Sequence, residues 1–203
     1  MTTWTLRDSA KTAQESKYTF FKSTESDIAQ VQPGENVKLI FDFTSDDPEA
    51  PEAERMWVLV DEITNEGTFI GRLDNTPRWI KDLQVGDTIA FDSRHIINTE
   101  HDDDNNLVNK YVKRCFVTNK ILQDGQKIGC VYREEPDTPE DSGWRFLAGD
   151  ETDEYMENSD NIAFVSIGAV LSQDDSVISL LEEPCGSTFQ KSAESNEFHR
   201  VKT

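Results

Sequence analysis

The stretch that decides the fold of the second half of the chain reads Ser142-Gly143-Trp144-Arg145-Phe146-Leu147-Ala148-Gly149-Asp150-Glu151. An aromatic segment typical of a strand is followed by a glycine turn and then by a block of carboxylates. Residues 134–160 hold 11 acidic side chains and one basic one, Arg145, which gives a net −10, half of the formal −20 of the chain. The sequence therefore predicts a folded domain with a strongly negative surface.

The overall composition limits the classes of function. A chain of 203 residues is long enough for one or two domains. The pI near 4.4 argues against a nucleic-acid partner, because phosphate binding needs clustered Lys and Arg. No apolar run approaches the roughly 18–20 residues of a membrane span, and the first residues lack the basic and apolar order of a secretory signal, so no membrane association is expected. An acidic surface fits either solubility or recognition of a basic partner, and composition leaves both open.

The cysteines indicate a reducing compartment. Cys115, Cys130 and Cys185 are far apart and show no CxxC spacing. An odd number of cysteines without a disulfide framework is typical of free thiols, so a cytoplasmic location is expected.

The first hundred residues show the pattern of a β-rich domain, which we place at 1–100. Residues 8–16 are expected to form a short helix capped by Asp8 or Ser9. Apolar residues then alternate with polar ones over 37–43, and further strands are expected over 56–63, 68–73 and 88–91. Short strands with a turn every 8–12 residues predict a small barrel or a curled antiparallel sheet.

An acidic segment, residues 101–112, is interpreted as a linker to a second domain at 113–190. Its Asp-rich start lacks the glycine and the distal glutamate of a calcium-binding loop. Strands are expected over 114–119, 128–132, 144–147 and 162–165, and helices over 168–171 and 175–181. Residues 191–203 are expected to be a loose tail. Strands and helices alternate without the long crossovers of a parallel sheet, so the predicted class is α+β.

No motif for catalysis or cofactor binding is present. The sequence has no HExxH, no phosphate-binding loop and no dinucleotide fingerprint, and its three histidines are not near a nucleophile motif. We therefore expect no enzyme activity, no cofactor and no metal. Carboxylate pairs such as Asp150 and Asp153 leave a carboxylate-based hydrolase as an alternative.

The second domain resembles the immunity protein 33 family, formerly domain of unknown function 2185. The resemblance covers about residues 113–190 and rests on the segments 117–121, 132–136, 141–146, 148–151, 154–156, 161–162, 180–181 and 186–187. It implies a bacterial cytoplasmic protein that neutralises the toxin encoded beside it by binding. The first domain resembles another uncharacterised family, domain of unknown function 2314, through residues 54–58, 71–75 and 82–87.

The candidate toxin-binding residues lie in the acidic block. Carboxylates facing a basic toxin surface would speed association and fix its orientation. The candidates are Asp150, Glu151, Asp153, Glu154, Glu157 and Asp160, together with Trp144, which could instead be a core residue. Arg145, the single base among them, is expected to pair with Asp150 or Glu151.

An alternative function places the activity in the first domain. There the chain would be a regulatory or housekeeping module that binds a peptide or a small molecule inside the barrel. Trp57, Asn75 and Trp79 would line that site.

Overall fold

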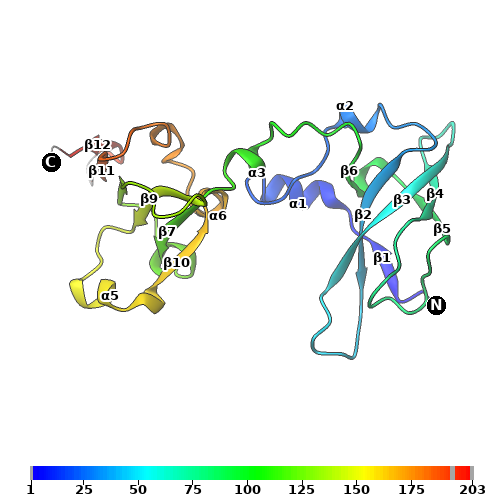
Figure 1. Cartoon of the computed structure of the whole chain (residues 1–203), viewed down its shortest axis with the longest axis horizontal. Helices are drawn as coiled ribbons and strands as arrows, with labels where there is room; N and C mark the ends of the chain where they lie inside the picture. Colours follow the sequence, from blue (N-terminus) through cyan, green and yellow to red (C-terminus); the bar gives the residue numbers. More distant parts are fainter. Residues whose placement is uncertain (1, 193–194, 202–203) are drawn as a thin grey trace. The chain divides into compact units, whose positions relative to one another are not determined.

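The computed structural model describes residues 2–192 and 195–201, and it divides into two compact units, 1–104 and 105–203. Each unit is built on one six-stranded sheet (Figure 1). The predicted class, a curled antiparallel sheet followed by an α+β domain, is confirmed.

The sheet of the first unit is a curled antiparallel half-barrel. Its strands run in the order β1-β2-β3-β4-β5, with β6 also paired to β2. Their bounds are β1 Trp4–Leu6, β2 Asn36–Phe43, β3 Ala53–Ile63, β4 Phe69–Leu73, β5 Thr88–Phe91 and β6 Ile96–Asn98. Gly71 of β4 allows close strand contact, because a Cβ there would lie 2.4 Å from the Leu59 carbonyl oxygen.

The core of this unit follows the alternation seen in the sequence. Val37, Leu39 and Phe41 of β2 are fully buried, and they pack with Met56 and Val58 of β3. Three helical segments accompany the sheet, namely α1 Ser9–Glu15, α2 Glu25–Ile28 and the 3-10 turn η1 Ser93–His95. The predicted cap of the first helix is present, since the Asp8 carboxylate accepts a hydrogen bond from the Ala10 N–H.

The start of the expected linker is an ordered part of the first unit. The Asp102 carboxylate accepts hydrogen bonds from Ser23, Asn98 and Thr99, and His101 Nε2 lies 2.9 Å from Glu35. The end of that segment contains a helical turn, α3 Leu107–Lys110, in the second unit.

The sheet of the second unit is mixed. Its strands run in the order β10-β7-β9-β8-β11-β12, and all neighbours are antiparallel except β7 and β9. The bounds are β7 Arg114–Thr118, β8 Cys130–Arg133, β9 Asp141–Leu147, β10 Ile162–Ser166, β11 Thr188–Lys191 and β12 Phe198–Arg200. The sequence predicted a loose tail over residues 191–203, whereas β12 pairs with β11 and extends the sheet; residues 193–194 and 202–203 of that tail lie outside the described residues.

Helices cover one face of this sheet. They are α4 Asn119–Leu122 and α6 Ile167–Gln173, which contact β7 and each other. Along β7, Cys115 and Val117 are buried while Phe116 between them is partly exposed, so the helices lie over the Cys115 side. The remaining segments are α5 Asp153–Glu157, η2 Ser159–Asn161 and η3 Ile178–Leu180.

The helix expected over 175–181 is wrong in extent, because only the 3-10 turn η3 forms there. Asp174 ends α6, and its carboxylate accepts hydrogen bonds from the N–H groups of Ile128 and Ser176. These bonds hold the chain in a turn where a regular helix would have to begin.

All three cysteines are free thiols. Among the residues described, no helix is long and apolar enough to cross a membrane.

Candidate functional site

The second unit positions its most distinctive side chains through a bulge in β9. Arg114 and Phe116 are two residues apart on β7, but their partners on β9, Asp141 and Arg145, are four apart. The two extra residues are accommodated at the buried Gly143, whose φ is +81° and where a Cβ would lie 2.2 Å from the Glu134 carbonyl oxygen. The bulge therefore brings the Asp141 and Arg145 side chains together.

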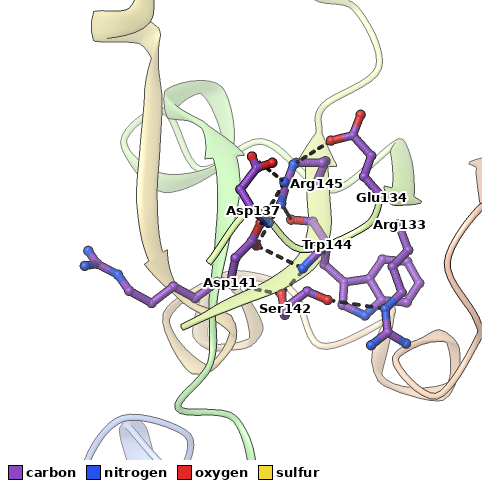
Figure 2. Close-up of polar contacts among 9 residues, drawn as sticks. Arg133, Glu134, Asp137, Asp141, Ser142, Trp144 and Arg145 are labelled. Atoms are coloured by element: carbon purple, nitrogen blue, oxygen red, sulfur yellow. Dashed lines mark hydrogen bonds and ion pairs between the residues drawn. The ribbon is translucent and has the colours of Figure 1, made fainter. Parts of the chain in front are cut away.

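Arg145 and Asp141 form a buried ion pair (Figure 2). Arg145 Nη1 and Nη2 donate to the two oxygens of Asp141 at 3.0 and 2.9 Å, and Nε donates to Glu134 at 3.0 Å. The side chains are 8% and 1% exposed. The predicted pairing of Arg145 with Asp150 or Glu151 is therefore wrong, because the bulge presents a closer carboxylate from the same strand.

The pair fixes the ionisation of Asp141. Hydrogen bonds from Arg145 lower the pKa of Asp141 to about 2, against the opposing effect of burial and with help from the N–H groups of Gly143 and Asp137. The carboxylate is thus charged across the physiological range, and the pair is a structural clamp at the start of the strand.

Trp144 lies on the other side of the strand from Arg145 (Figure 2). It is 1% exposed, and its ring lies 6.2 Å from that of Phe146 between centroids. Of the two roles considered for Trp144, the structure thus places it in the core.

Two of the acidic candidates are held by neighbouring groups. Lys120 Nζ lies 2.9 Å from the Asp150 carboxylate. The Glu151 carboxylate accepts hydrogen bonds of 2.7 Å from Thr118 Oγ1 and from the N–H groups of Ala148 and Gly149. Burial alone would raise the pKa of Glu151, but these hydrogen bonds outweigh it and keep the pKa below its ordinary value.

The other four acidic candidates project into solvent. Asp153, Glu154 and Glu157 belong to α5, and Asp160 belongs to η2; all four residues are exposed. None of them forms an ion pair with any residue in the described part of the chain. We call these four residues the acidic rim.

The backbone beneath the acidic rim is held by several hydrogen bonds. Thr152 caps α5 by accepting from the Tyr155 N–H, and Asn161 Nδ2 donates to the Tyr155 carbonyl oxygen at 2.8 Å. Asn119 Nδ2 on α4 donates to the Asp160 carbonyl oxygen at 2.8 Å. The carboxylates of the rim are therefore presented on an ordered segment.

A cavity of about 430 Å³ lies on the uncovered face of the sheet, beside the acidic rim. Strand register sets its floor, because Phe164 of β10 pairs with Phe116, Phe116 pairs with Arg145, and Arg145 pairs with Tyr132. Residues at paired positions point to the same face of a sheet. The lining consists of Phe116, Val117, Thr118, Tyr132, Arg145, Phe146, Leu147, Met156, Ser159, Ile162 and Phe164.

The sequence did not predict this cavity. Its only local signal was a phenylalanine at the centre of each of two short apolar segments, Phe116 in residues 114–118 and Phe164 in residues 162–166, and both rings are only partly buried. Sequence alone could not show that these two distant strands are neighbours, with their rings 4.7 Å apart.

Two of the candidate residues of the first unit contact each other, and the third lines a cavity. Asn75 Oδ1 accepts a hydrogen bond from the Trp57 N–H, and Lys38 Nζ lies 4.6 Å from the Trp57 ring. Trp79 lines a separate cavity of about 350 Å³ with Thr3, Thr44, Ser45, Asp46, Asp47 and Lys81.

No group of three or more His, Cys, Asp or Glu side chains suited to a metal ion occurs in residues 2–192 and 195–201.

These features define a two-unit α+β protein with a curled antiparallel half-barrel and a mixed sheet bordered by acidic residues. The chain belongs to the DUF2314 family, described as uncharacterized protein conserved in bacteria, whose family model matches residues 4–126. Residues 115–202 match the model of the immunity protein Imm33 domain. Both resemblances seen in the sequence are confirmed, and the second supports a role in toxin immunity in general. A search of curated proteins and a search of solved structures each found no match.

Proposed function

We propose that this chain is a bacterial immunity-type protein that acts in the cytoplasm and neutralises a cognate toxin by one-to-one binding. In this proposal the second unit makes the contact through its acidic surface, the toxin presents a basic one, and no catalysis is involved. The observation that carries the proposal is the acidic rim: four exposed carboxylates without ion pairs in the described chain, within a region similar to an immunity domain.

The arrangement of the rim suits rapid capture of a protein. Complementary charge raises association rates well above those of neutral surfaces and disfavours wrong partners. The hydrogen bonds beneath α5 and η2 reduce the ordering needed on binding. Glu151 adds to the same negative potential because its hydrogen-bond donors are uncharged, whereas Lys120 offsets the charge of Asp150.

The test uses the protein encoded directly upstream of this gene and the double variant Glu154→Lys/Glu157→Lys. These two substitutions make the charge of the rim more positive by four units. The change is expected to weaken binding by about tenfold or more, mainly through slower association, and to flatten the salt dependence of the association rate. Surface plasmon resonance at low and high salt would measure both effects.

The matched control is Glu62→Lys/Glu66→Lys, which changes the net charge equally on exposed residues of the first unit. We avoid Glu151 because its substitution would also break three hydrogen bonds. Equal losses in the two double variants would show that net charge alone matters, and no binding by the wild type would reject the proposal.

A further inference from the structure

The cavity beside the acidic rim is apolar and open on one side. Phe116, Phe164, Ile162, Met156 and Leu147 are all partly exposed there, on a sheet face that α4 and α6 leave uncovered. A volume of about 430 Å³ lies within the range of sites that accept a ligand or a bulky side chain.

The one charged group in the lining is already paired with carboxylates. Arg145 donates four of its five N–H groups, from Nε to Glu134, from Nη1 to Asp141 and to the Trp144 carbonyl, and from Nη2 to Asp141, and the Asp137 carboxylate lies 4.0 Å from Nη2. Its Cζ atom lies 4.7 Å from the centre of the Phe116 ring. The guanidinium group therefore extends the aromatic floor by a cation–π contact, and it does not form an anion site.

Acidic side chains contact or adjoin several of the residues that line the cavity. Glu134 contacts Arg145 of the floor, Glu151 contacts Thr118 of the wall, and Glu157 and Asp160 adjoin the lining residues Met156 and Ser159. A neutral or anionic occupant would gain nothing from this border, whereas an apolar group flanked by positive charges would match both the cavity and its edge.

We infer that the cavity receives one bulky apolar side chain of the toxin, carried on a segment with lysine or arginine on both sides. This inference rests on the proposed function and names the feature of the partner that the second unit recognises. The apolar side chain supplies contact area in a site that excludes water, and the flanking cations pair with the acidic rim.

The test uses two short synthetic peptides that differ at one position, a phenylalanine or an alanine between two pairs of lysines. Binding to the full chain would be followed by the NMR signal of the Met156 methyl group, with the buried Met56 methyl of the first unit as an internal reference. The phenylalanine peptide is expected to bind about tenfold more tightly, because its ring is removed from water.

Two variants separate apolar insertion from charge. Ile162→Asp adds a negative charge inside the cavity, so a purely electrostatic site would bind both peptides at least as well as before. Insertion of a ring predicts instead that the tenfold preference disappears. Ser159→Trp fills the cavity from an exposed position and should have the same effect without disturbing the core. Val85→Asp, at an exposed apolar residue of the first unit, is the matched control.

Equal binding of the two peptides by the wild type, or a preference that survives in Ser159→Trp, would overturn the inference. So would uncharged indole shifting the Met156 signal at lower concentration than the phenylalanine peptide, because the occupant would then be a small molecule. If the peptide test fails, the charge-reversal experiment with the upstream protein can still support the proposed function. Conversely, selective binding of the phenylalanine peptide without binding of the upstream protein would reject the proposed function, while the chemistry inferred for the occupant of the cavity would stand.

Discussion

Replacing Arg145 with methionine is expected to lower the free energy of unfolding of the second unit by about 3–5 kcal/mol, because it leaves a buried carboxylate without its countercharge. Asp141 is 1% exposed and receives two hydrogen bonds from Arg145. Urea unfolding of the full chain labelled with fluorotryptophan would measure the loss, since Trp144 is the single tryptophan of the second unit.

Two further measurements show whether the buried pair is the cause. The double variant Asp141→Asn/Arg145→Met also removes the unpaired charge of Asp141, so it should recover part of the lost free energy of unfolding. Because the folded pKa of Asp141, about 2, lies below its ordinary value of 3.8, the pair's contribution is complete above pH 3.8 and is lost as the pH falls through about 2. In the single variant this acid-dependent contribution should be absent. A destabilisation below about 1 kcal/mol would indicate a pair no stronger than a surface salt bridge.

Replacing Trp144 with alanine is expected to destabilise the second unit by about 3–5 kcal/mol, as is typical when a large aromatic side chain is removed from a core. The residue is 1% exposed, and Arg133 lies over its ring at 5.5 Å. The same urea experiment would follow the second unit through the NMR signal of the Met156 methyl group, because the variant lacks the tryptophan probe.

The companion variant Trp144→Phe separates the core role from a direct toxin contact. Phenylalanine keeps most of the buried volume, so this variant should fold. It should also bind the upstream protein with an affinity within about twofold of the wild type, because a buried ring has no surface that a partner could contact. A folded Trp144→Phe protein with binding reduced by about tenfold or more would show that the residue is a toxin contact.

Local patterns in the sequence predicted much of the fold. Alternation along 37–43 identified the buried side of β2, and the capped helix near Asp8 was correct, because both depend on residues close in the chain. The α+β class followed from the order of such segments. The turn at 175–181 was misjudged because apolar spacing suggested a helix, whereas the Asp174 carboxylate bonds to the distant Ile128 N–H.

The candidate site depends on contacts that no local pattern contains. The sequence showed a dense acidic block but not which of its carboxylates are bonded to other residues. Asp150 pairs with Lys120 of α4 and Glu151 with Thr118 of β7, both about thirty positions earlier in the chain. Arg145 pairs with Asp141 because a bulge at Gly143 shifts the register between β7 and β9. The cavity requires β10 beside β7, a pairing between segments separated in sequence by two strands, two helices and a 3-10 turn.

The most direct test of the central claim is carboxyl footprinting of the chain with and without the upstream protein. Exposed carboxylates would be labelled with a carbodiimide and an amine, and mass spectrometry would give the labelling rate of each. The proposal predicts that the upstream protein protects Asp153, Glu154, Glu157 and Asp160, while Glu62 and Glu66 of the first unit are labelled as before. Unchanged labelling of the four rim residues in a complex that protects Glu62 and Glu66 would contradict it.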